Sequence, residues 1–261
     1  MKAKAKVLSL ALSAALLAGC AQVPPDAGQN PEDPWETFNR NMWAFNQGLD
    51  VVVKPVTEGY RFIVPKPARE GVSNFFDNLL EPGNAVNNLL QGKVSGTLTS
   101  VFRFLLNSTI GVAGIFDVAT WVGMERQPED FGQTLGVWGV GPGPYLVLPV
   151  LGPSSPRDIW RWPVQAALNP MTYILWDEEW YWETGYLVVD GLDTRSRMMD
   201  DGLDDMLENT LDSYTAVRTA YRQMRRNQVS DGQQTGEEQL KELTPLDFGD
   251  DEEAPKETDK K

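Results

Sequence analysis

The sequence of 261 residues predicts an all-α domain that lies between a secretory leader and an acidic tail. Apolar residues recur at spacings of three and four in several segments, which is typical of amphipathic helices. Two of these segments open with Asp-Pro or Ser-Pro, a pattern that caps and starts helices, and Gly and Pro separate the segments. No apolar run without helix breakers reaches the roughly 20 residues that a membrane-spanning helix needs.

The leader occupies residues 1–19 and has the features of a secretory signal peptide. Three lysines precede the apolar stretch 7–17, and small residues precede Cys20. The run Leu17-Ala18-Gly19-Cys20 resembles the lipobox of bacterial lipoproteins, in which the chain is cut before the cysteine and the thiol and new N-terminus are acylated. Cys20 is the only cysteine, so no disulfide within one copy competes for it. The alternative is an ordinary signal peptide that happens to carry a cysteine.

With Cys20 as the lipid anchor, residues 20–32 form a Pro-containing tether between the acyl chains and the domain. Several acyl chains hold a protein stably at a membrane, whereas a single chain binds reversibly. Ala21 stands where an Asp would retain a lipoprotein at the inner membrane. By resemblance to that sorting rule, we expect the outer membrane.

The composition excludes several classes of function. The formal net charge of −14 argues against a nucleic-acid partner, because Lys and Arg are needed to bind phosphates. The chain has no histidine, which removes His-dependent triads, His metal sites and the commonest general base. No carboxylate cluster, phosphate loop or dinucleotide fingerprint stands out. We therefore expect no catalytic residue, no metal and no cofactor.

The helical domain is expected at residues 33–229, and its first helix at Asp33-Pro34-Trp35-Glu36. Asp33 is placed to cap, Pro34 suits the first helical position, and Glu36 completes a capping box. Pro55 is expected to end this helix. Its apolar face suits either a core or a lipid layer, and both interpretations stay open. The residues on that face are Trp35, Phe38, Met42, Phe45, Leu49 and Val52.

A second helix is expected after Val64-Pro65-Lys66-Pro67. Glu81-Pro82 is expected to break it before a short helix over residues 84–91. The segment 93–122 that follows is the most apolar of the chain. Its longest uncharged run, 104–116, has 13 residues, which suits a helix that is buried or partly immersed in lipid.

Residues 132–156 carry no charge and contain six glycines and five prolines. That density of helix breakers excludes a membrane-spanning helix, because lipid leaves free backbone groups unpaired. We expect a short helix near residues 131–137, a loop at Gly141-Pro142-Gly143-Pro144 and an extended piece at 145–148. An uncharged loop of this kind suits the passage of a lipid chain or a partner, or is a plain surface connection.

Ser155-Pro156-Arg157-Asp158 repeats the capped start and opens a segment rich in Trp and Tyr. Such residues suit the headgroup layer of a membrane, with a core cluster as the alternative. They are Trp160, Trp162, Tyr173, Trp176, Trp180, Tyr181 and Trp182. Helices are expected over residues 183–202 and 204–223, and the Arg-rich end of the second is explained by the helix dipole. Residues 230–261 are acidic with few apolar anchors, which predicts a disordered tail.

A series of ordered motifs resembles the MlaA (VacJ) family of outer-membrane lipoproteins, over roughly residues 33–221. The resemblance weakens at residues 160–182 and in the tail. The matching motifs are Phe38-Asn39-Arg40, Val64-Pro65-Lys66-Pro67-Ala68-Arg69, Ser73-Asn74-Phe75, Asn78-Leu79-Leu80-Glu81-Pro82, Asn87 to Gly92, Arg103-Phe104-Leu105-Leu106-Asn107, Phe116-Asp117-Val118-Ala119, Phe131-Gly132-Gln133-Thr134-Leu135-Gly136 and Gly139-Val140-Gly141-Pro142-Gly143-Pro144-Tyr145.

This resemblance implies a ring-shaped assembly of amphipathic helices in the inner leaflet of the outer membrane, at its periplasmic face. Such proteins pass mislocalised outer-leaflet phospholipid to a soluble periplasmic lipid-carrier protein, for delivery to an ATP-driven inner-membrane complex. A trimeric porin holds the ring. The resemblance also implies that the loop at Gly141, Gly143 and Tyr145 and the first helix around Phe45 and Asn46 border the lipid path.

Two other classes of function stay open at this point. A lipid hydrolase or acyltransferase that uses Asp or Glu would release fatty acid or lysolipid from phospholipid. A structural lipoprotein that tethers the envelope would leave the phospholipid content of the outer leaflet unchanged.

Overall fold

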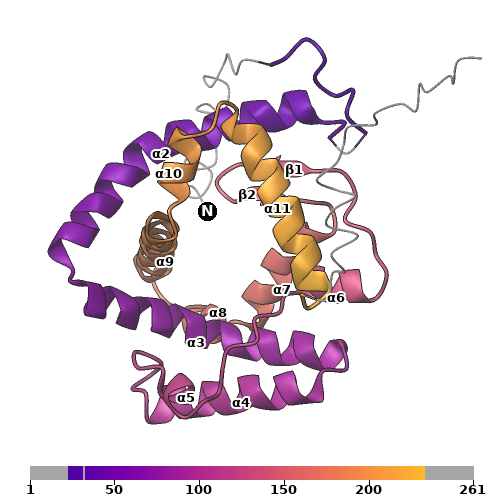
Figure 1. Ribbon diagram of the computed structural model, residues 1–261. Helices are drawn as coiled ribbons and strands as arrows, with labels where there is room; N and C mark the ends of the chain where they lie inside the picture. The colour runs from indigo at the N-terminus through magenta and orange to yellow at the C-terminus, as the bar shows by residue number, and fades with distance from the viewer. Residues whose placement is uncertain (1–22, 32, 233–261) are drawn as a thin grey trace, which may run out of the picture.

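The computed structural model describes residues 23–31 and 33–232, and its helices are arranged as a ring (Figure 1). The leader, Cys20 and the tail from residue 233 lie outside the described residues. Two long helices, α2 (Glu36–Ile63) and α3 (Lys66–Leu90), form much of the circumference. The all-α class predicted from the sequence is confirmed, because one two-stranded hairpin is the only sheet in the described part.

Both long helices continue through a proline, so the predicted ends at Pro55 and Pro82 are wrong. A proline within a helix removes one backbone donor and bends the axis, but it does not end the helix when packing favours continuation. In α2 the bend follows the curve of the ring (Figure 1). Side-chain amides support the backbone after Pro82, where Asn87 donates to the Gly83 carbonyl at 2.9 Å.

The predicted capping box at the start of α2 is also wrong. The helix begins at Glu36, and no side chain caps it. The Asp33 carboxylate instead accepts from the Asn39 amide at 2.8 Å and from Arg218 at 2.8 Å. Glu36 binds Arg40 at 2.8 Å. Asp33 therefore connects the start of α2 to a residue far along the chain, which local spacing does not reveal, whereas Glu36 pairs within α2 itself.

Helix α4 (Val94–Thr109) runs along α3, and the short α5 (Val118–Trp121) packs against it (Figure 1). The chain between them turns through Val112 and Ala113, which have φ angles of 53° and 56°. Helix α6 (Phe131–Val137) is capped by Asp130, whose carboxylate accepts from the Gln133 N–H at 2.8 Å. The predicted helix near 131–137 is confirmed.

A glycine- and proline-containing loop connects α6 to the hairpin, as predicted. Strand β1 (Leu146–Leu148) pairs antiparallel with β2 (Gly152–Ser154), with Val147 opposite Pro153. The core of this region is small and aromatic. Tyr145 packs edge-on against Tyr214, with ring centroids 6.0 Å apart, and Val147 and Tyr221 complete the cluster.

The remaining elements return across the ring to its starting point (Figure 1). The Ser155 hydroxyl accepts from the Asp158 N–H at 3.1 Å, which confirms the predicted capped start. The helix expected over 204–223 is wrong, because the chain breaks before Asp212, which caps the last helix. The elements are η1 (Asp158–Trp160), α7 (Arg161–Leu168), α8 (Pro170–Ile174), α9 (Trp180–Asp200), α10 (Leu203–Glu208) and α11 (Ser213–Val229).

In the described part of the chain, no helix has both the length and the apolarity that a bilayer crossing requires.

Candidate functional site

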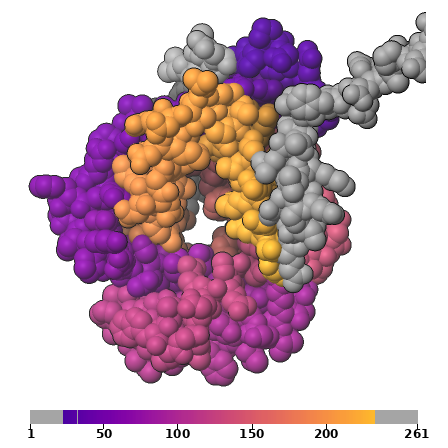
Figure 2. Space-filling view, viewed as in Figure 1, coloured from indigo at the N-terminus to yellow at the C-terminus, as the bar shows by residue number. Residues whose placement is uncertain are grey.

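The ring has an opening, which Figure 2 shows between α9 and α11. Helices α2 and α3 enclose this space from two sides, and α9 lies on the inner side of α2 (Figure 1). A central opening in a helical ring is a route through the molecule. The polarity of the buried and exposed residues of the ring indicates which kind of ligand could use this route.

Burial of polar residues distinguishes this protein from an ordinary globular domain, in which cores are apolar and charges are exposed. Between the helices lie carboxylates, guanidinium groups and amides, while few large apolar side chains are buried. We call this set the polar core. It comprises Asn39, Glu81, Asn84, Asn87, Asn88, Arg103, Asp158, Asp193 and Arg225.

The apolar residues of α2 and α4 are largely exposed. Helix α4 buries Ser100, Arg103 and Asn107 toward its neighbours and leaves its apolar face bare on the outer edge of the molecule (Figure 1). On the predicted face of α2, Trp35, Phe38 and Val52 are exposed and so are not in a core, whereas Phe45 is buried and Met42 packs against the buried cluster. We call the exposed set the apolar rim: Val51, Val52, Val56, Phe62, Ile63, Val94, Leu98, Val101, Phe102 and Leu105.

The Trp- and Tyr-rich segment is exposed as well. Its seven aromatic residues range from Trp162, 37% exposed, to Trp176, 81% exposed. A core cluster is therefore excluded. Exposed Trp and Tyr interspersed with acids suit a membrane interface, where the apolar part of each aromatic side chain contacts lipid and its N–H or O–H group contacts water.

Arg103 is the centre of the first ionic network, where α4 packs on α3. It donates to Glu81 at 2.8 Å and to both oxygens of Asp117 at 3.0 Å, and it contacts the Met124 carbonyl. Burial opposes ionisation of Asp117, but hydrogen bonds from Thr120, Asn107 and Arg103 outweigh it and lower the pKa of this carboxyl. Glu81 and Arg103 are almost fully buried, so this pair is shielded from water.

A second network fixes α11 to α6 and η1. Arg225 donates to Asp130 at 2.6 Å and to Asp158 at 2.8 Å, and Arg157 shares Asp158 at 3.0 Å. Burial disfavours the charged form of Asp158, yet the bonds from Arg225 and Arg157 hold its pKa well below the usual range. Arg225 thus binds acids of two other elements, a contact that the helix-dipole interpretation of the Arg-rich end of α11 did not include.

Helix α9 is attached to the ring through polar contacts. Arg195 binds Asp50 at 2.8 Å and Asp204 at 2.7 Å. Ser73 donates to Asp193 at 2.6 Å. The inner helix is therefore held to α2 and α3 by charges and hydroxyl groups.

Asp190 on α9 provides a pH test of this polar attachment. Burial raises the pKa of Asp190, Arg197 opposes the shift, and Asp193 and Asp77 add to it. A carboxyl whose pKa is higher in the folded state costs stability above that pKa and costs nothing below its unfolded pKa. We expect Asp190→Asn to increase the free energy of unfolding slightly at pH 8, and the gain to vanish as the pH falls through the ordinary Asp range.

Thermal unfolding in detergent at several pH values measures this effect. Asp201→Asn, an exposed acid just after the same helix, is the control and should change nothing. An Asp190→Asn gain that is equal at pH 8 and at pH 3.5 would contradict the assignment.

The residues predicted to border a lipid path lie around the junction of α2 with the hairpin. Asn46 donates to the Leu148 carbonyl at 2.9 Å and accepts from the Val150 N–H at 2.7 Å. The side chains of Phe45 and Tyr145 are buried, so they support this junction from within.

Gly141 and Gly143 are exposed in the loop before β1. Gly143 has a φ of 72°, a conformation that favours glycine. These positions place the two glycines on a solvent-accessible connection. Their role at a lipid path stays a prediction.

Sequence reasoning missed Asn39 as a second clamp on the hairpin. Its amide donates to the Tyr145 carbonyl at 2.9 Å and accepts from the Val147 N–H at 2.9 Å. One asparagine side chain thus provides the donor and acceptor that a neighbouring strand would provide. The signal in the sequence is the repeat of Asn at 39 and 46, two helical turns apart.

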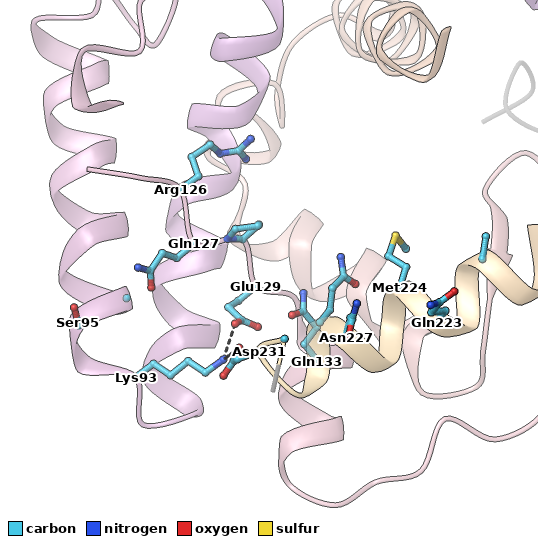
Figure 3. A pocket seen from close by; sticks show the side chains of 15 residues that line it. Lys93, Ser95, Arg126, Gln127, Glu129, Gln133, Gln223, Met224, Asn227 and Asp231 are labelled. Atoms are coloured by element: carbon cyan, nitrogen blue, oxygen red, sulfur yellow. Dashed lines mark hydrogen bonds and ion pairs between the residues drawn. The ribbon is translucent and has the colours of Figure 1, made fainter. Parts of the chain in front are cut away.

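A polar groove of about 1010 Å³ lies where the start of α4, residues 126–129 and the end of α11 meet (Figure 3). Lys93 binds Glu129 at 2.8 Å across it and also binds Asp231 at 2.5 Å. These contacts join the end of α11 to α4. The two ion pairs of Lys93 therefore help to close the ring near the C-terminal end of α11.

Comparison with known proteins gives a consistent result. A family model described as "MlaA lipoprotein" matches residues 31–228. The chain is 38% identical to the "Intermembrane phospholipid transport system lipoprotein MlaA" of Shigella flexneri, covering 84% of this chain and 86% of that protein. It is 33% identical to the protein of the same name from Haemophilus influenzae, covering 89% and 93%.

A solved structure also matches, described by the words "Structural basis for maintenance of bacterial outer membrane lipid asymmetry". Its TM-score is 0.64 and its sequence identity is 38%, and the match covers 76% of this chain and 98% of that one.

Proposed function

Because the chain belongs to the MlaA lipoprotein family, we propose that it is the outer-membrane lipoprotein of an intermembrane phospholipid transport system. In this function it removes mislocalised phospholipid from the outer leaflet and so maintains lipid asymmetry. The observation that carries the proposal is the helical ring with an opening, whose buried contacts are polar and whose outer helices expose apolar residues.

The chemistry of a phospholipid explains why such a ring is useful. Moving a charged headgroup through hydrocarbon is costly, whereas its acyl chains are stable there. The apolar rim can lie among acyl chains, because the backbone polar groups of α2 and α4 are bonded within the helices. The opening then gives the headgroup a route through the leaflet that avoids hydrocarbon. No covalent bond changes in this process, so the proposal includes no enzymatic step.

The finer parts of the proposal are the anchor, the face of the membrane and the partners. Acyl chains on Cys20 would hold the ring at the periplasmic face, as the lipobox-like Leu17-Ala18-Gly19-Cys20 suggests. A trimeric porin and a soluble periplasmic lipid carrier are the expected protein partners. The names of the relatives support the phospholipid and the transport system.

Measurement of outer-leaflet phospholipid tests the function. Cells that lack the gene should accumulate phospholipid in the outer leaflet, and the wild-type gene should restore the normal content. An unchanged content would favour a structural tether. Free fatty acid or lysolipid released by the purified protein would favour an enzyme.

Val150 at the turn of the hairpin is expected to matter for lipid passage. It is 75% exposed and has a φ of 69°, which is strained for a β-branched residue. The Asn46 side chain holds the Val150 N–H at 2.7 Å, which helps to keep this strained turn and its exposed side chain in place. We expect Val150→Asp to raise outer-leaflet phospholipid at least halfway to the level of the deletion, because a charge disfavours contact with acyl chains.

The fold should tolerate the change, since Asp adopts this backbone conformation more readily than Val. Val150→Gly relieves the strain without adding charge and is the matched control. If Val150→Asp cells keep wild-type outer-leaflet phospholipid, the hairpin turn does not contact the lipid.

A further inference from the structure

Arg161 differs from the other described arginines because, within the described part of the chain, it makes no ion pair within 4 Å and no hydrogen bond; it acts on Asp130 only from a longer distance. The two acids near it are already bound. Asp158 is shared by Arg157 and Arg225, and Asp130 is bound by Arg225 at two distances, 2.6 and 2.9 Å. Two carboxylates are thus balanced by two guanidinium groups, and the charge of Arg161 is in excess.

The position of Arg161 is nevertheless well defined. Its guanidinium carbon lies 4.3 Å from the centroid of the Trp162 ring, a distance at which the cation is attracted to the ring face. Its Nε is buried without an acceptor. One helical turn further, the Nε2 of Gln165 is also buried without an acceptor, and this amide lies against Gly83 of α3. The Gln165 amide therefore faces α3, and the terminal N–H groups of Arg161 are the donors that a ligand could reach.

Helix α7 lies on the inner side of the ring between α3 and α6, close to α11 (Figure 1). Trp160 and Trp162, on either side of Arg161, are 55% and 37% exposed. The arrangement joins a spare positive charge to partly exposed aromatic surface. A ligand that matches it has an anionic group with at least two acceptor oxygens next to an apolar part.

We propose that Arg161 binds the phosphate of a phospholipid headgroup as the lipid passes through the ring. The inference rests on the proposed function and adds to it a residue and a chemistry. A phosphodiester carries one negative charge, and its two free oxygens match the paired N–H groups of a guanidinium. The other described arginines of this region are bound to carboxylates, so Arg161 is the one that can engage a ligand without breaking an ion pair.

Binding to the purified full-length protein in detergent tests the chemistry. The probes are phosphatidylglycerol, diacylglycerol with the same acyl chains, and inorganic phosphate. We expect Arg161→Gln to weaken phosphatidylglycerol binding about tenfold, on the scale of one lost charge-assisted hydrogen bond. It should leave diacylglycerol binding unchanged, and Arg161→Lys should retain part of the affinity. Lys66→Gln, which removes an exposed charge on α3, is the control.

Two results would overturn the proposal. Equal loss of phosphatidylglycerol and diacylglycerol binding would mean that Arg161 does not recognise the phosphate. Inorganic phosphate that binds at Arg161 as tightly as phosphatidylglycerol would make the ligand a free anion. A structural role is tested by thermal unfolding: Arg161→Gln should keep a Tm close to wild type, because it removes the contact with the Trp162 ring but no ion pair or hydrogen bond, and a large decrease in Tm would also overturn the proposal.

Outer-leaflet phospholipid in cells separates this proposal from the function itself. If the gene deletion raises this phospholipid and Arg161→Gln does not, the assignment of Arg161 fails and the transport function stands. If the deletion itself has no effect, the proposed function fails. Both proposals hold if Arg161→Gln raises outer-leaflet phospholipid toward the deletion level.

Discussion

Replacing Arg103 by methionine is expected to lower the free energy of unfolding by about 3–5 kcal/mol, the usual cost of removing one partner of a buried ion pair. The side chains of Arg103 and Glu81 are only 2% and 1% exposed. Without the guanidinium, Glu81 would lose its 2.8 Å bond in a position that water does not reach, and would keep only the Asn84 amide at 3.1 Å and the more distant Arg126 at 3.8 Å. Asp117 would lose two bonds of 3.0 Å. Urea or thermal unfolding in detergent measures the change.

The control for this experiment is Lys54→Met, which breaks a pair with Asp204 that water partly reaches, because the two side chains are 35% and 20% exposed. Exposed pairs contribute about 0–1 kcal/mol, so this variant should stay close to wild type. The double variant Glu81→Leu/Arg103→Met should recover part of the loss, because it removes both buried charges. If Arg103→Met is no more destabilising than Lys54→Met, the network is not shielded from water as the structure indicates.

Replacing Cys20 by alanine is expected to have the largest effect on function. Each buried CH₂ of an acyl chain contributes about 0.8 kcal/mol to the free energy of membrane binding. Loss of acylation removes this contribution, and we expect that the apolar rim does not fully replace it. We expect less than a tenth of the protein in the outer-membrane fraction and outer-leaflet phospholipid near the level of the gene deletion. Membrane fractionation and outer-leaflet labelling measure the two effects.

Ala21→Ser keeps the lipidated cysteine and is the matched control. A Cys20→Ala protein that fractionates with the outer membrane and restores lipid asymmetry would contradict the assignment of the anchor. That result would show that the apolar rim alone holds the ring in the leaflet.

Much of the helical content was predictable, because helices have local signals. The helix cap at Ser155 and the loop around Gly141 and Gly143 were identified from sequence alone. The errors at Pro55 and Pro82 have one cause: a proline has a local cost that is visible in sequence, while the packing that outweighs it is tertiary. The break before Asp212 was missed because apolar spacing continued across it.

The site was less predictable than the fold. A helix with one apolar and one polar face gives the same periodic pattern whichever face is buried, so spacing did not reveal that the apolar rim is exposed. The better signal is the polar stripe of α3, where Asn78, Glu81, Asn84 and Asn88 recur at helical spacing and are buried. Charge balance at Arg161 depends in part on Asp130 and Arg225, which lie more than 30 positions away in the sequence, so it required the structure.

The polar core also reverses the usual rule for tolerated sequence change. In most soluble proteins surface positions tolerate many substitutions, whereas core positions must stay apolar. Here, exchanges among Leu, Val and Phe at positions such as 98 and 102 should pass with little consequence, since a fluid acyl layer fits any of them. An isosteric change at Asn39 or Asn87, by contrast, alters a donor that one carbonyl requires. A redesign of this scaffold should therefore keep the residues of the polar core and vary those of the apolar rim.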